Sequence, residues 1–158
     1  MIVVDTNVIA YLYLPGPHTA AAEALLERDP HWCAPLLWRS ELRNILAGYL
    51  RRGTLTLEQA LATQREAEGL MAAGEHDVDS EAVLRLVADS HCTAYDCEFV
   101  ALARALGTPL VTMDGQLLKA FGDTAVALDR LQAGTSINRP YPPPDHASRA
   151  PTMRLLVF

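Results

Sequence analysis

Residues 1–12 of the chain read MIVVDTNVIAYL, and they place an acid directly after a short run of apolar residues. Ile2–Val4 is rich in β-branched side chains, which is typical of a strand that is buried on both faces of a sheet. Asp5 follows at once, and Asn7 comes two positions later. In open sheets of parallel strands, ligands bind at the carboxyl ends of the strands. The stretch therefore predicts an α/β fold and marks Asp5 as a candidate site residue.

Strands and helices alternate along the rest of the chain as far as Leu131. The expected helices cover residues 19–28, 37–52, 57–71, 93–106 and 115–121, and another begins at residue 80. The expected strands cover residues 31–34, 75–78, 108–114 and 124–128. Short apolar strands that alternate with helices are typical of a mostly parallel sheet with helices on both faces.

The composition indicates one domain that is not a general nucleic-acid binder. At 158 residues the chain has about the length of a single ordinary domain. Its net charge of −6 argues against broad, unspecific binding of nucleic acids, which usually shows as a basic domain. We expect a soluble, cytoplasmic protein without a membrane partner, because the sequence has neither a long apolar run nor a secretory signal pattern. Without a CxxC pair, the three cysteines favour buried, reduced thiols: Cys33, Cys92 and Cys97.

The last segment of the chain differs in composition from the rest. Residues 132–158 are rich in proline and lack periodicity, so we expect a domain at residues 1–131 followed by a C-terminal tail. The apolar ending MRLLVF, residues 153–158, could add a strand to a neighbouring molecule or be unrelated to the fold. The sequence does not decide between these two interpretations.

One acid lies on the apolar face of a predicted helix. Glu41 falls in the stripe formed by Leu37, Ile45 and Tyr49, which are spaced by four residues. This spacing predicts that Glu41 faces inward. An ionised carboxylate that is buried alone costs several kcal/mol, so Glu41 needs an arginine, a hydrogen-bond network or a cation.

A second helical acid repeats this pattern. Asp96 lies three and four residues before the apolar Phe99 and Val100, and we expect its side chain to face inward. Glu98 is two positions further on and is expected at the surface. Because Asp96 stands in the first turn, interaction with the amino end of the helix is a competing explanation.

The fourth acid, Asp114, follows a predicted strand, as Asp5 does. An acid in this position often caps the next helix, and this alternative applies to both residues. Four acids that converge on one pocket would repel one another, and a divalent cation would resolve the repulsion. Oxygen ligands without histidine or cysteine favour Mg²⁺ or Mn²⁺, which can activate a water molecule for attack on a phosphodiester.

At these residues the sequence resembles the PIN-domain family, and within it the VapC-like toxin ribonucleases of toxin–antitoxin pairs. The matching motifs are VVDTNVIAYL at residues 3–12, RSELRNIL at residues 39–46, and TAYDCEFVALARALGTPLVTMD at residues 93–114. The resemblance covers about residues 1–131. It implies a PIN-like three-layer sandwich, with a mostly parallel five-stranded sheet flanked by helices.

The resemblance also implies an activity and a set of site residues. The four acids Asp5, Glu41, Asp96 and Asp114 would bind Mg²⁺ or Mn²⁺ for metal-dependent cleavage of RNA, leaving a 5′-phosphate and a 3′-hydroxyl. Hydrogen bonds to the acids would come from four supporting residues: Thr6, Asn7, Ser40 and Thr112. A homodimer and a small cognate antitoxin that covers the site are expected partners.

Two other functions compete with the metal-dependent ribonuclease. A catalytically silent PIN-like module that binds nucleic acid or protein would keep the fold, although the presence of all four acids argues against it. A haloacid-dehalogenase-like phosphatase also has an acid after its first strand, but the second acid of its motif is replaced here by Asn7. Three cations are candidates for contact with the RNA backbone, while a solvated helix face is the alternative: Arg39, Arg43 and Lys119.

Overall fold

The computed structural model describes residues 1–133, and the elements follow the expected alternation. The expected tail, apart from its first two residues, lies outside the described residues. The strands are β1 (Ile2–Val4), β2 (Trp32–Pro35), β3 (Glu75–His76), β4 (Leu110–Thr112) and β5 (Ala125–Ala127). The helices are α1 (Thr6–Tyr13), α2 (Thr19–Arg28), α3 (Trp38–Arg51), α4 (Leu57–Met71), α5 (Ser80–Ala88), α6 (Ala94–Leu106) and α7 (Gly115–Ala120), followed by the 3₁₀ helix η1 (Leu128–Ala133).

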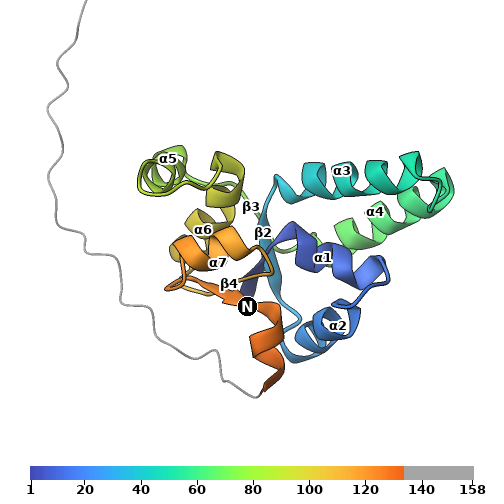
Figure 1. The fold of residues 1–158 in the computed structure, drawn as a ribbon, viewed down its shortest axis with the longest axis horizontal. Helices are drawn as coiled ribbons and strands as arrows, with labels where there is room; N and C mark the ends of the chain where they lie inside the picture. The colour runs from blue at the N-terminus through green and yellow to red at the C-terminus, as the bar shows by residue number, and fades with distance from the viewer. Residues whose placement is uncertain (134–158) are drawn as a thin grey trace, which may run out of the picture.

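The five strands form one parallel sheet in the order β3-β2-β1-β4-β5, which confirms the expected fold class. Strand β1 lies in the middle, where Val3 pairs with Cys33 of β2 and with Leu110 of β4. Helices α1–α4 gather on one side of the sheet, and α5–α7 gather on the other (Figure 1). Because all strands run in the same direction, residues that follow β1 and β4 meet at one edge of the sheet.

Local signals explain where several helices begin and end. Thr56 accepts a hydrogen bond from the Gln59 backbone N–H while the Gln59 side chain accepts one from the Thr56 N–H, which fixes the start of α4. Gly107 ends α6 in the left-handed conformation, with φ of 62°, which a residue with a Cβ atom rarely adopts. Helix α1 was not among the expected elements. It begins directly after Asp5, without a loop that would have marked its start.

The core lies between the sheet and the helices on both faces. Its largest fully buried side chains include Trp38 of α3 and Phe99 of α6. The three cysteines are buried and form no disulfide with one another, as expected. Among residues 1–133, no helix is both long enough and apolar enough to cross a membrane.

Candidate acidic site

Asp5 lies between strand β1 and helix α1, where it is the N-cap residue of the helix. Its carboxylate is buried, with 7% of the residue exposed, and its Oδ2 accepts a hydrogen bond of 2.6 Å from the Thr112 hydroxyl. Its Oδ1 accepts a long hydrogen bond of 3.5 Å from the backbone N–H of Asn7, and with this bond the Asp5 side chain caps α1. Burial raises the pKa of Asp5, because the ionised form loses hydration. The sheet therefore holds a carboxylate in an environment that disfavours its charge.

Asp114 occupies the corresponding position between β4 and α7. Its Oδ1 accepts hydrogen bonds from the backbone N–H groups of Gln116 (2.7 Å) and Leu117 (3.1 Å). The backbone N–H of Asp114 donates to the Thr112 hydroxyl over 2.9 Å. The Thr112 hydroxyl thus links the two strand-end acids, since it donates to Asp5 and accepts from Asp114.

Glu41 is half-buried, and the sequence analysis placed it one position away from the true buried stripe. The buried face of α3 runs through Trp38, Leu42 and Leu46, so Glu41 borders the core instead of pointing into it. Its Oε2 accepts a hydrogen bond from the hydroxyl of Thr6, the first residue of α1. Burial raises the pKa of Glu41. The charges of neighbouring carboxylates raise it further.

Asp96 lies in the first turn of α6, where it forms a capping box with Thr93. Its Oδ2 accepts hydrogen bonds from the Thr93 backbone N–H (3.1 Å) and from the Thr93 hydroxyl (2.7 Å). The Asp96 N–H donates to the Thr93 hydroxyl in return. Asp96 therefore interacts with the amino end of its own helix, as the competing explanation expected.

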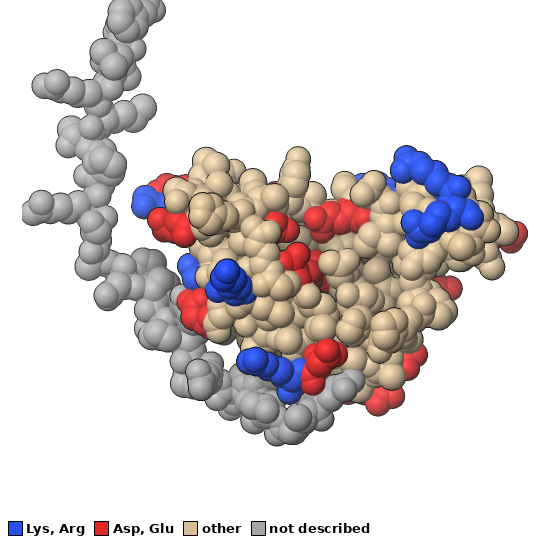
Figure 2. All heavy atoms as spheres, in the orientation of Figure 1, with Lys and Arg blue, Asp and Glu red and all other residues tan. Residues whose placement is uncertain are grey.

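The fold brings the four acids to one edge of the sheet. The charges of Asp96 and Asp114 raise the pKa of Asp5, and those of Asp5 and Asp96 raise the pKa of Glu41. Acidic side chains line the hollow between the two groups of helices (Figure 2). Within residues 1–133, no lysine, arginine or histidine forms an ion pair with any of the four.

The carboxylate oxygens fit a hard divalent cation by their chemistry, although their present positions do not enclose one. No three histidine, cysteine, aspartate or glutamate side chains of the described part of the chain are close enough to hold a metal ion. The protein fixes one oxygen of each of three acids, and the other oxygen has no hydrogen-bond partner among residues 1–133. These three oxygens are Oε1 of Glu41, Oδ1 of Asp96 and Oδ2 of Asp114. They remain available to an added ligand.

The expected supporting residues differ in their contacts. Thr6 and Thr112 donate hydroxyl hydrogen bonds to Glu41 and Asp5. By contrast, the Asn7 residue is exposed and contacts Asp5 through its backbone N–H. The hydroxyl of Ser40 accepts a bond from Arg43 and reaches none of the four acids.

The three candidate RNA-binding cations also differ. Arg39 forms ion pairs with Glu75 of β3 and with Glu68 of α4, so its charge already has partners within the protein. Arg43 and Lys119 are exposed and form no ion pair within residues 1–133. The structure therefore leaves Arg43 and Lys119 as the stronger candidates.

Glu98 is less exposed than expected, because the prediction that it lies at the surface was wrong. Glu98 is half-buried on α6, burial raises its pKa, and its charge contributes to the raised pKa of Glu41. The buried face of α6 includes Cys97 and Val100, so Asp96 and Glu98 border that face from its two sides. Both acids are direct sequence neighbours of Cys97, which was expected to be buried, and this position could have indicated that Glu98 is half-buried.

Comparison with known proteins identifies the family to which the chain belongs. The model of the PIN domain family matches residues 2–122, and the chain is a member of that family. It is similar to Ribonuclease VapC3 of Pyrobaculum aerophilum, with 31% identity over 124 residues that cover 76% of this chain and 94% of the relative.

Two solved structures share the fold at lower sequence identity. PAE2754 from Pyrobaculum aerophilum has a TM-score of 0.64 and 22% identity, and the match covers 84% of this chain and 93% of the other. A chain from a toxin–antitoxin complex of Klebsiella pneumoniae has a TM-score of 0.61 and 15% identity, with 81% and 98% covered. Family membership leaves the phosphatase alternative without support.

Proposed function

We propose that this PIN-domain protein is a metal-dependent endoribonuclease that hydrolyses phosphodiester bonds in RNA. The observation that carries the proposal is a group of four carboxylates at one edge of the sheet, none of which has a cationic partner within the described residues. The charges of their neighbours in this group add to the effect of burial in raising the pKa of Asp5 and the pKa of Glu41. Such a group is costly unless a cation neutralises it. The name of the relative, Ribonuclease VapC3, supports RNA as the substrate.

Asp5, Glu41, Asp96 and Asp114 would hold Mg²⁺ or Mn²⁺, through the oxygens that the protein leaves unbonded and through small side-chain rotations. Such an ion supplies an activated water molecule and stabilises negative charge on the leaving oxygen. The residues of the chain provide position. The hydroxyls of Thr6 and Thr112 hold Glu41 and Asp5, and the two strand-end acids are fixed at the start of their helices.

We further infer that the protein acts as the toxin of a toxin–antitoxin pair in the cytoplasm. The resemblance in fold to a chain of a toxin–antitoxin complex supports an antitoxin partner, which we expect to be a small protein that covers the site. A homodimer is part of the same proposal. Leu57 and Leu61 lie one turn apart on α4 and are 64% and 49% exposed, so they offer an apolar contact for a second copy. Light scattering of the purified protein, with and without Leu57→Glu, tests this contact.

Cleavage of a total-RNA pool by the purified protein tests the activity. Incubation with Mg²⁺ or Mn²⁺ should produce fragments with 5′-phosphate ends, and EDTA should abolish them. Asp5→Asn removes one ligand charge while it keeps a helix-capping side chain. Glu66→Gln is the matched control, because Glu66 is an exposed acid on α4 with no hydrogen bond or ion pair among the described residues.

Loss of cleavage in Asp5→Asn but not in Glu66→Gln is the expected result. Equal cleavage by wild type and Asp5→Asn would contradict the proposal. A folded wild-type protein that binds RNA but cuts nothing under any metal condition would instead favour a silent binding module.

A further inference from the structure

A cavity of about 380 Å³ lies beside the four acids and has no part in the proposed chemistry. It opens where β2 and β3 end, and the Leu36 backbone N–H at its edge donates to the carbonyl of His76 over 3.1 Å. Helices α5 and α6 close the cavity, and Glu98 of α6 lines it. Glu98 lies two residues after Asp96 on the same helix, so the cavity adjoins the acidic site. Its volume falls within the roughly 300–1,000 Å³ of small-molecule sites.

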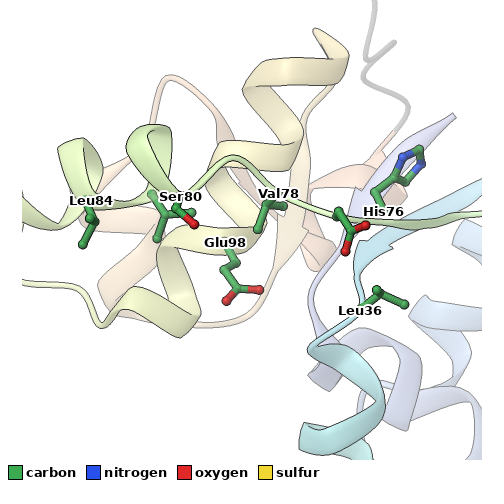
Figure 3. A pocket seen from close by; sticks show the side chains of 8 residues that line it. Leu36, His76, Val78, Ser80, Leu84 and Glu98 are labelled. Carbon is green, nitrogen blue, oxygen red and sulfur yellow. The ribbon is translucent and has the colours of Figure 1, made fainter. Parts of the chain in front are cut away.

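The cavity is open to solvent, and apolar side chains make up part of its walls. Leu36 is 46% exposed and Leu84 is 64% exposed, and both line the cavity together with Val78. Figure 3 shows the side chains of Leu84, Val78 and Glu98 directed into the same space, from α5, from the segment before it and from α6. These exposed apolar side chains offer a surface against which one face of a flat ring can be buried.

The polar groups of the cavity have no partners of their own. Within residues 1–133, the side chains of Asp77, Ser80 and Glu98 form no hydrogen bond or ion pair. Glu98 is half-buried, and no donor in the described part of the chain forms a hydrogen bond with its carboxylate. A half-buried carboxylate without a donor indicates a ligand that brings donors of its own.

We propose that this cavity binds the base of a guanine nucleotide in a single-stranded segment of the RNA, next to the bond that is cut. The proposal rests on the proposed ribonuclease function and adds a specificity-determining residue, Glu98. Guanine presents two adjacent donors, N1–H and the N2 amino group, which one carboxylate can accept as a pair. Proteins commonly read unstacked RNA bases through the Watson–Crick edge in this manner.

The same chemistry excludes the other bases. Uracil presents a single N–H flanked by two carbonyl oxygens, which the carboxylates of Glu98 and Asp77 would repel. Adenine and cytosine each place an acceptor nitrogen beside their amino group, so they offer one donor instead of two. The phosphates of the strand would lie outside the cavity, away from these two acids.

Nucleotide binding measured by NMR tests the proposal without any need for cleavage. The probes are GMP, IMP and UMP, titrated against the full chain with the methyl groups of Leu36, Val78 and Leu84 as reporters. GMP and IMP carry the same phosphate and sugar and differ only in the N2 amino group. We expect saturable shifts at these methyl groups and an affinity for GMP about tenfold higher than for IMP, since a paired hydrogen bond to a base typically contributes 1–3 kcal/mol.

Two variants separate recognition of the base from contact with the wall. Glu98→Gln should lower the affinity for GMP about tenfold and remove the difference between GMP and IMP. Leu84→Ala changes an exposed side chain that the fold does not need, and it should weaken GMP, IMP and UMP by the same factor. Glu66→Gln, in the other group of helices, should leave all three unchanged.

Three outcomes would overturn the guanine proposal. One is equal affinity for the three nucleotides, another is methyl shifts confined to other parts of the protein, and the third is an unchanged preference in Glu98→Gln. Its failure is distinguishable from failure of the ribonuclease function. A protein that cuts RNA without preference for guanine beside the cut retains the function and loses the subsite, whereas one that binds GMP selectively but cuts nothing retains the subsite alone.

Discussion

Thr112→Val removes the hydroxyl that joins the two strand-end acids, and it should destabilise the protein by roughly 2.5–4 kcal/mol at pH 7. Thr112 is fully buried, and valine has nearly the same shape, so packing changes little. The hydrogen bond to the Asp5 carboxylate, of 2.6 Å, contributes about 1.5–3 kcal/mol because its acceptor is ionised. The bond of 2.9 Å from the Asp114 N–H contributes about 1 kcal/mol more.

The pH dependence of this loss is a second, independent part of the prediction. The Thr112 hydrogen bond lowers the pKa of Asp5 against the larger effect of burial, so it stabilises the ionised form. This stabilisation is present where folded Asp5 is ionised and is lost as the pH falls through its folded pKa, which burial places above the ordinary value of about 3.9. The difference between wild type and Thr112→Val should therefore be smaller at pH 4 than at pH 7.

Urea unfolding, followed by circular dichroism at both pH values, measures the loss. Thr112→Ser is the matched control, because it keeps the hydroxyl and removes one buried methyl group, at a cost of about 1 kcal/mol. A Thr112→Val protein at least as stable as Thr112→Ser at pH 7 would refute the reasoning. RNA cleavage by Thr112→Val should also fall, since Asp5 loses its fixed orientation.

Three other changes have outcomes that the structure fixes. Asp5→Asn should raise the stability by about 1 kcal/mol at pH 7, because burial raises the pKa of Asp5 and its ionised form is disfavoured; the gain in urea unfolding should shrink toward pH 4. Arg39→Met should cost about 1 kcal/mol at pH 7. That loss should fade as the pH drops through the folded pKa of Glu75, which Arg39 lowers, and the same titration measures it. Gly74→Ala should cost at least about 3 kcal/mol in thermal or urea unfolding, because the new Cβ would lie 1.9 Å from the backbone oxygen of Trp32.

Elements whose ends carry local signals could be predicted from the sequence to the residue. Helix α4 begins after Thr56 because the capping box depends only on two side chains and the nearby backbone. Helix α1 could not be predicted in the same way. Its eight residues, TNVIAYLY, are mostly apolar, so their periodicity does not distinguish a helix from a continued strand. Contact with the sheet and with neighbouring helices stabilises it, and the local sequence does not encode that contact.

The composition of the site was more predictable than its geometry. Asp5 and Asp114 were expected at one edge because parallel strands align their carboxyl ends, and the pairing of β1 with β4 places them there. Glu41 was predicted to point into the core, and it lies at the border of the core instead. The stripe through Leu37 and Ile45 is only partly buried, and the buried stripe of α3 lies one position further along the helix. A helix turns 100° at each residue, so an error of one position moves a side chain from the core to its border.

The sequence analysis treated helix capping and site formation as competing explanations for the acids, and the structure makes them parts of one arrangement. Asp114 uses Oδ1 to accept the N–H groups of α7, and Asp96 uses Oδ2 to close its capping box. In both residues the second oxygen has no partner within residues 1–133. A cap holds the carboxyl group by one oxygen at a fixed place and leaves the other oxygen for a ligand. Capping therefore fixes the position of these carboxyl groups and leaves one oxygen of each able to bind a ligand, because the backbone N–H groups at the start of a helix supply the donors.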